Sequence, residues 1–284
     1  MIRSTIRGAA LAAVLAMIPG VSLAATWSDT FIGYRYGTQF TEPNIKSDIK
    51  KHIVQFGHAS GYAYGQNFMN LDVLLSDKAD PAQGGDTGAT DVYLTYRHQL
   101  HLGKILDRSF AFGPVKEVAI TAGFDLSTKN TAFAPRKRMA VLGPTLKFDV
   151  PGFLDLSLLY TVERNNCGLS VCSTAPNHNS HGFDPYLILN AAWGIPFHAA
   201  GMPMKFQGFM NYITPKGRDY FNVKTKAETL VRTSVMLDVG QMAWGAKNTL
   251  WLGVGYEYWQ HKFGNHGKPG VNTRSPTLQL ELHF

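Results

Sequence analysis

Long apolar runs are missing from most of this chain. After its first 24 residues, no stretch reaches the roughly 18 consecutive apolar residues that a membrane-spanning helix needs. Charged residues are also scarce, because they make up 17% of the chain where an average soluble domain has about 25%. These two absences exclude a bundle of transmembrane helices and disfavour an ordinary soluble domain.

Clusters of basic residues are missing as well. The formal net charge is +7, but the lysines and arginines are scattered and no basic helix is visible. Domains that bind nucleic acids concentrate such charge on one face or along one helix. We therefore expect no nucleic-acid partner.

The first 24 residues have the pattern of a secretory signal peptide. Arg3 and Arg7 form a basic segment, an apolar run of about 11 residues follows, and Ser22 and Ala24 supply the small residues of a cleavage site. A retained membrane anchor is the alternative, but that run is too short to span a bilayer as a helix. We predict export and cleavage after Ala24, which leaves residues 25–284 as one domain.

Cysteine is nearly absent. The two cysteines are Cys167 and Cys172, in the run Cys-Gly-Leu-Ser-Val-Cys. Because an exported chain reaches an oxidising compartment, this pair predicts a disulfide that closes a small loop. A metal site that also uses His178 and His181 is the alternative, but the ligand spacing is irregular. We expect the disulfide, with no bound metal and no cofactor.

Alternation of apolar and polar residues is the strongest positive feature of the chain. It occurs in segments of about 9 to 13 residues, as in tilted strands that cross a membrane. In the last segment, Leu278 and Leu280 lie on one face, and Gln279 and Glu281 lie on the other. A soluble β-sandwich would alternate too. Long segments, tyrosines and tryptophans toward strand ends, and a final Phe284 favour an all-β transmembrane antiparallel barrel.

The alternation predicts twelve strands separated by links of two kinds. The predicted strands are 28–40, 51–59, 62–76, 89–100, 114–127, 137–149, 153–164, 183–197, 203–214, 227–239, 249–261 and 273–284. Links after odd-numbered strands are long and polar. Most of the others are tight, including 60–61 and 240–248, whereas 101–113 has room for a short helix around Leu102–Arg108. Outer-membrane barrels have short periplasmic turns and long extracellular loops. The expected location is therefore the Gram-negative outer membrane, where Phe284 would engage the barrel-assembly machinery.

The parity of each strand selects the side chains that would point into the barrel. Aromatic and charged residues alternate among them, which suits a polar solute with a flat face, because rings stack while ions and amides bond its polar edge. The alternative is that they only fill the lumen and hold its shape. The candidate substrate-binding residues are Phe31, Arg35, Phe68, Asp72, Tyr93, Arg97, Glu117, Tyr186, Arg232, Trp251, Glu257 and Trp259.

One fragment indicates an enzyme instead. His58 and Ser60 stand two residues apart, on one face of a regular strand. A histidine that acts as general base for a serine is the chemistry of outer-membrane lipases and deacylases. No partner that would orient His58 and no longer lipase motif is evident, so this enzyme is an alternative. A structural or adhesive barrel that works through its outer loops is the third hypothesis.

A resemblance to a known family adds to this interpretation. The run Phe112-Gly113-Pro114-Val115-Lys116-Glu117 resembles the Phe-Gly-Pro-x-Lys-Glu run that leads into a strand in the Tsx-like nucleoside-specific channels, which include OmpK-type proteins. The runs 61–68 and 143–150 and the aromatic closing strand are also similar to that family.

The resemblance implies a monomeric twelve-stranded barrel whose narrow lumen passively admits nucleosides. Members of the family also serve as receptors for phages and colicins through their outer loops. We therefore predict a non-enzymatic, substrate-selective diffusion channel. Its expected partners are outer-membrane lipid and small polar solutes such as nucleosides.

Overall fold

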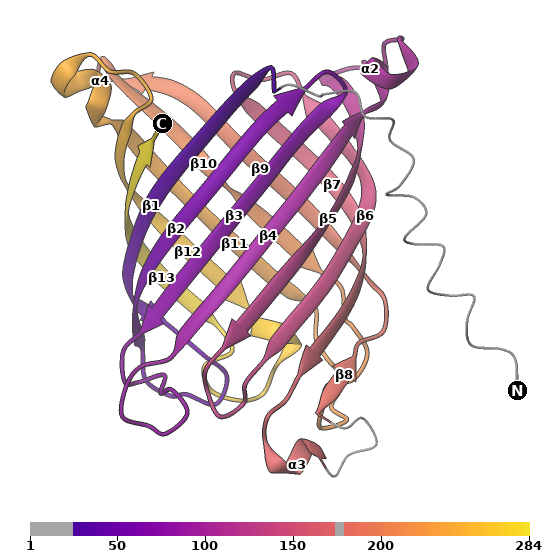
Figure 1. The fold of residues 1–284 in the computed structure, drawn as a ribbon, viewed down its shortest axis with the longest axis vertical. Helices are drawn as coiled ribbons and strands as arrows, with labels where there is room; N and C mark the ends of the chain where they lie inside the picture. The colour runs from indigo at the N-terminus through magenta and orange to yellow at the C-terminus, as the bar shows by residue number, and fades with distance from the viewer. Residues whose placement is uncertain (1–24, 174–178) are drawn as a thin grey trace, which may run out of the picture.

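The structure is a computed structural model that describes residues 25–173 and 179–284. The predicted signal peptide and His178 lie outside the described residues. Within them, no helix is long and apolar enough to cross a membrane. Figure 1 shows that the strands wrap into a single closed wall.

Twelve strands form this wall, as the sequence predicted. Each is antiparallel to its neighbours, and β13 pairs with β1 to close the sheet. The twelve are β1 (Trp27–Phe40), β2 (Ile49–Tyr62), β3 (Gly65–Ser76), β4 (Thr90–His101), β5 (Val115–Lys129), β6 (Arg136–Phe148), β7 (Phe153–Asn166), β9 (Tyr186–Ala199), β10 (Met202–Ile213), β11 (Glu228–Asp238), β12 (Leu250–Gln260) and β13 (Thr273–His283). Every predicted strand boundary lies within three residues of the observed one.

The two faces of the wall have opposite character. Outward side chains such as Leu142, Leu158 and Leu278 are 46–59% exposed, although they are apolar. Inward side chains such as Arg35 and Asp72 are charged and buried. An exposed apolar exterior is stable only against an apolar solvent, and a closed sheet leaves no unpaired backbone there. The chain is a transmembrane β-barrel.

The two ends of the barrel differ in the length of their connections. At one end, the turn end, short links and the helices α2 (Leu102–Leu106) and α4 (Val239–Trp244) join the strands. At the other, the loop end, the connections are generally longer and reach 13 residues in 77–89 and 14 in 214–227, although 130–135 has six. Figure 1 places the turn end at the top, together with the end of β13, and the long loops at the bottom.

The first turn differs from the prediction. Positions 60–61 belong to β2, and the chain reverses at 63–64. Gly61 has another role, because a Cβ at this position would overlap the Trp27 indole on the neighbouring strand. The glycine that predicted a turn is therefore required for close packing against an aromatic ring.

The link 240–248 is also different from the prediction, because it contains α4 where a tight turn was expected. Asp238 caps the helix by accepting a hydrogen bond from the Gln241 amide at 2.9 Å. Gly245 ends it in the left-handed region with φ of 76°. The other predicted helix, near Leu102, is confirmed as α2.

The connection 167–185 at the loop end carries two short elements that the sequence did not predict. They are α3 (Ser170–Ser173) and β8 (Ser180–Gly182), which pairs with the end of β7. The predicted disulfide between Cys167 and Cys172 is present at the base of this connection. It ties α3 to the end of β7.

Candidate functional site in the lumen

Register places all twelve candidate residues on the inward side of their strands. Residues that pair directly across two strands project to the same face. Phe68 pairs with Arg97, and Asp72 pairs with Tyr93. Strand parity alone therefore predicted which side chains would face the lumen.

A chain of ion pairs crosses the middle of the lumen. Asp72 on β3 receives Arg232 of β11 at 3.2 Å and Arg35 of β1 at 3.4 Å. Arg232 also pairs with Glu257 at 3.0 Å. Strands β3 and β11 are five strand steps apart in one direction around the wall and seven in the other. The Asp72–Arg232 contact therefore joins nearly opposite sides of the barrel and divides its interior.

Asp72 is the most heavily bonded carboxylate of this chain of ion pairs. It also accepts hydrogen bonds from Asn70 at 2.7 Å and Gln55 at 3.2 Å. Arg35 and Asp72 are 1% and 4% exposed, so the network closes them off from water. Buried charges persist only when their partners are this complete. This part of the lumen is filled, as the shape-holding alternative expected.

Beside the bridge, some inward side chains remain accessible. Phe68 is 41% exposed, and the side chains of Arg97 and Arg232 are each 21% exposed. The Arg232 guanidinium lies 5.4 Å from the ring centre of Phe209, its cross-strand partner. Two pairs of one arginine and one phenylalanine, on β3–β4 and on β10–β11, thus line the open part of the lumen. Such a surface offers ring faces and fixed hydrogen-bond donors together.

Sequence reasoning missed several residues of this accessible surface. Phe209 and Gln207 are inward on β10, and Asn190 of β9 donates to Asn211 at 2.7 Å. The alternation of residues in 203–214 indicated these inward positions. The alternation is weak in this strand, because Phe209 and Ile213 add apolar side chains to its inward face.

Asp125 anchors Arg97. The carboxylate accepts from Arg97 at 2.6 Å and from the Tyr93 hydroxyl at 2.7 Å. The predicted residues Tyr93 and Arg97 are therefore brought together with Asp125, which holds the guanidinium on the β5 side of β4.

A cage of lysines surrounds Glu42 at the loop end, in the connection between β1 and β2. Glu42 contacts Lys51 at 2.6 Å, Lys262 at 3.1 Å and Lys129 at 3.4 Å, and Lys129 also contacts Asp80. Burial alone would raise the pKa of Glu42, but the three ammonium groups lower it well below its usual value. Burial lowers the pKa of Lys262 despite the nearby carboxylate. With Asp80, the cage ties together two strands, β2 and β5, and three connections.

A second loop-end cluster covers two of the predicted aromatic residues. Lys216 lies 3.4 Å from Glu163 and 3.3 Å from Glu228. The Tyr186 hydroxyl donates to Glu163 at 2.6 Å, and the Trp259 indole donates to Glu228 at 3.2 Å. Tyr186 is 4% exposed, so its ring is packed and offers no free face.

The inward groups at the turn end gather around Glu281. Gln207 donates to this carboxylate at 2.6 Å, and Lys205 lies 3.4 Å from it while stacking over the Trp251 ring. Phe31 stacks on His283, with ring centres 5.1 Å apart. Trp251 is buried, and its ring, like that of Tyr186, is covered.

The family-like run forms the turn between α2 and β5. The backbones of Phe112 and Val115 exchange two hydrogen bonds of 2.9 Å, and Gly113 has φ of 49°. Glu117 accepts from the Gly103 amide at 3.1 Å and so holds α2, while Lys116 is exposed in a bulge. These residues lie at the turn end, away from the central bridge.

The His58 and Ser60 pair lies on the outward face of β2, near the turn end. His58 Nδ1 is 2.8 Å from the hydroxyl of Thr30, its cross-strand partner. Ser60 pairs with Ser28 of β1. The two residues thus face the apolar exterior.

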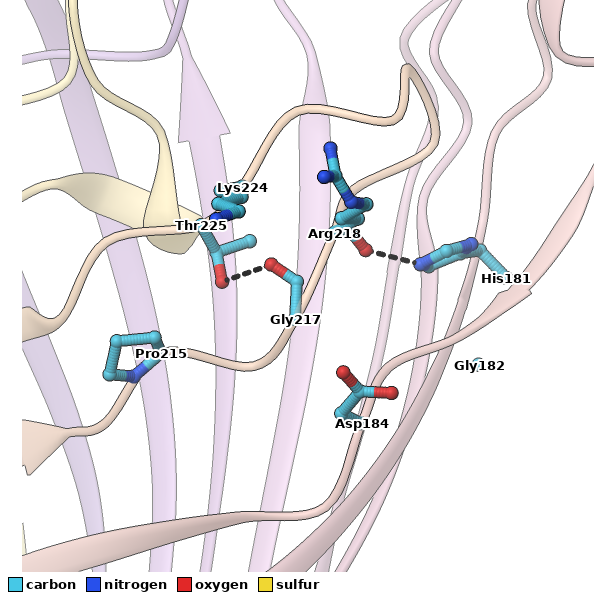
Figure 2. Close-up of a pocket in the computed structure, with 8 residues that line it drawn as sticks. All are labelled: His181, Gly182, Asp184, Pro215, Gly217, Arg218, Lys224 and Thr225. Carbon is cyan, nitrogen blue, oxygen red and sulfur yellow. Dashed lines mark hydrogen bonds between the residues drawn. The ribbon is translucent and has the colours of Figure 1, made fainter.

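A separate pocket of about 430 Å³ lies at the loop end, between β8 and the connection 214–227. Figure 2 shows His181 bonded to the Arg218 carbonyl and Thr225 bonded to the Gly217 carbonyl across it. Asp184 points toward Gly217 from the opposite wall. Among the described residues, no group of three or more His, Cys, Asp or Glu side chains is arranged to hold a metal ion.

Comparisons with known proteins find similarity in structure only. No protein-family model and no curated protein matches the sequence. The translocator domain of the autotransporter NalP from Neisseria meningitidis is 12% identical with a TM-score of 0.49, over 97% of this chain and 92% of that chain. The KdgM porin in complex with disordered oligogalacturonate is 10% identical with a TM-score of 0.43, over 89% and 99%. OpdK of Pseudomonas aeruginosa with vanillate is 9% identical with a TM-score of 0.27, over 90% and 98%.

Proposed function

We propose that this chain is a selective diffusion channel of the Gram-negative outer membrane, and that nucleosides are its solute class. The accessible lumen surface carries this proposal. Phe68 and Phe209 offer ring faces there, while Arg97 and Arg232, their cross-strand partners, supply hydrogen-bond donors. A nucleoside has one flat base and several hydroxyls, and this surface complements both.

In this mechanism a solute exchanges weak contacts along the lumen. The base stacks on a phenylalanine, which is worth about 1–3 kcal/mol per base, while hydroxyls bond to the arginines and amides. The Asp72–Arg232 bridge crosses the solute's path, and passage requires Arg232 to turn aside while Asp72 keeps Arg35 and Asn70. Binding of this strength selects a solute and still releases it.

Location and assembly belong to the same proposal. The apolar exterior matches a bilayer, the leader before residue 25 directs export, and the loop end faces outward. Closure through β1 and β13 completes the barrel within one chain, which is consistent with a monomer. In this account Phe284 at the end of β13 engages the assembly machinery, and the chain has no catalytic role.

Single-channel recording in planar bilayers tests the channel and its solute together. We expect steps of current that adenosine or thymidine block at millimolar concentration. The variant Phe68→Ala should weaken the block about tenfold, since one stacking contact is lost. Phe124→Ala, which removes an outward ring on β5, is the matched control and should leave the block unchanged. Current without any nucleoside block would leave a channel and remove the nucleoside assignment.

A structural or adhesive barrel is the second candidate. It is favoured by the dense ion pairing that buries Arg35, Asp72 and the Glu42 cage. The same recording separates the two, because a structural barrel shows no conductance steps in bilayers that contain folded protein.

A further inference from the structure

The distribution of charge on the barrel strands is strongly sided. In the described residues, every Asp and Glu on the twelve barrel strands lies on the inward side of its register. At the loop end, five strand cations lie on the outward side and are exposed: Lys50, Arg136, Arg138, Arg164 and Arg274. A further exposed strand cation, Lys116, lies in the bulge at the turn end of β5. On the outward side of the strands, the described residues at the loop end therefore carry cations and no carboxylate, while exposed carboxyls such as Asp48 lie in the connections.

Three of these cations converge on one patch of the rim, which we call the arginine patch: Arg136, Arg138 and Arg164. Arg138 of β6 stands directly opposite Arg164 of β7 in the register. Arg136 lies two residues before Arg138 and projects to the same face. Like charges placed directly opposite each other on neighbouring strands destabilise a sheet.

Nothing in the described part of the chain neutralises this patch. No ion pair joins Arg138 or Arg164 to a carboxylate there, whereas inward cations such as Lys51 and Lys147 have carboxylates at 2.6 and 2.8 Å. Beside Arg164 lies Gly182 of β8, where a Cβ would be 3.8 Å from the guanidinium. Because Gly182 has no side chain, it leaves one side of the Arg164 guanidinium uncovered.

The arginine patch lies at the border of the apolar exterior. Along β6, the outward residues that follow Arg138 are Ala140 and Leu142, and Leu142 is 56% exposed. The next outward residue before Arg164 is Val162, which is 45% exposed, and Tyr160 follows at 53%. β8 pairs with this end of β7, which in turn pairs with β6; Figure 1 shows β8 at the loop end. A lipid whose acyl chains cover Leu142 and Val162 therefore brings its headgroup against the arginines.

We propose that the arginine patch is a binding site for the phosphate groups of a lipid in the outer leaflet, of the lipid A type. Guanidinium groups bind phosphate oxygens through paired, charge-assisted hydrogen bonds. A phosphate between Arg138 and Arg164 removes their mutual repulsion, and Arg136 supplies further donors. The site rests on the proposed outer-membrane location but does not depend on conduction through the lumen.

Titration of the full-length folded protein in detergent with bis-phosphorylated lipid A, followed by native mass spectrometry, tests the site. We expect a bound lipid, and the double variant Arg138→Gln/Arg164→Gln should bind it about tenfold more weakly. The variant Lys104→Gln/Lys247→Gln removes two exposed charges from the turn end and should bind like the wild type. Gel mobility before and after heating verifies that each barrel is folded.

Two further probes identify the source of the phosphate. Dephosphorylated lipid A should bind as weakly to the wild type as intact lipid A binds to the double variant. Inorganic phosphate alone should not occupy the site at micromolar concentration. Equal binding of lipid A by the wild type and the double variant, equal binding of dephosphorylated lipid, or tight binding of free phosphate would each overturn the proposal. A protein that binds lipid A in this way and shows no conductance would refute the channel and leave the site standing.

Discussion

Arg232 is the residue on which the central network depends. It joins Asp72 to Glu257, and Glu257 has no other ion-pair partner within the described residues. Arg232→Gln would leave Glu257 buried without its ion-pair partner, and removing one member of a buried pair costs about 3 kcal/mol. We expect lower stability in urea unfolding from vesicles, together with a larger single-channel current because the transluminal bridge is gone.

The matched control for this change is Arg274→Gln, which removes an outward arginine from β13. It should alter neither the unfolding midpoint nor the current. A smaller current in Arg232→Gln than in the wild type would show that the bridge does not obstruct the lumen.

For single residues, the sequence predicted which side chains point into the barrel but not which of them contact each other. Alternation placed Asp72 and Arg232 on the inward side, as the register confirms. Their contact at 3.2 Å depends on how far opposite strands are displaced along the barrel axis, and no local pattern encodes that displacement. For the same reason the sequence could not distinguish the covered ring of Tyr186 from the accessible ring of Phe68.

The connection between β1 and β2 is held by one carboxylate, and this makes it sensitive to pH. The pKa of Glu42 is lowered from its usual 4.5 in the folded chain. Its stabilising contribution is therefore full above pH 4.5 and is lost as the pH falls below that value. Glu42→Gln should cost about 3 kcal/mol near neutral pH, since three lysines lose their shared partner.

Unfolding in urea at pH 7 and at pH 3.5 measures this effect. The difference between the wild type and Glu42→Gln should be large at pH 7 and should shrink at pH 3.5. Asp48→Asn, which changes an exposed carboxyl of the same connection, should follow the wild type at both values. A difference that stays constant with pH would contradict the ionic role of Glu42.

Strands were predicted well, because their alternation repeats over many residues. The first turn, α4 and β8 were not, because only a few residues indicate each of them. Twelve alternating segments became twelve strands, whereas the glycine at position 61 indicated a turn that lies at 63–64. Asp238 stands three residues before Gln241, the spacing of a helix N-cap, but α4 is too short to show an apolar period. β8 has three residues, fewer than alternation can reveal.

At the scale of the whole molecule, the exterior must match a bilayer. Leu158 lies near the middle of β7, faces outward and is 46% exposed. Leu158→Arg should destabilise the folded barrel by about 2–4 kcal/mol, the cost of an arginine at the bilayer midplane. Urea unfolding from phospholipid vesicles measures it, and Leu158→Val should change stability by less than about 1.5 kcal/mol. Equal stability of the arginine variant and the wild type would mean that this face does not meet lipid.

In the proposed function, solutes pass through the lumen beside the Asp72–Arg232 bridge. Cysteine substitution on β10 tests it directly, because both native cysteines are held in a disulfide. Phe209 faces inward next to Arg232, whereas Phe206 faces outward on the same strand and stacks on Trp193. A charged methanethiosulfonate reagent should reduce the single-channel current of Phe209→Cys and leave that of Phe206→Cys unchanged. Full labelling of Phe209→Cys with no change in current would mean that solutes and ions do not pass beside the bridge.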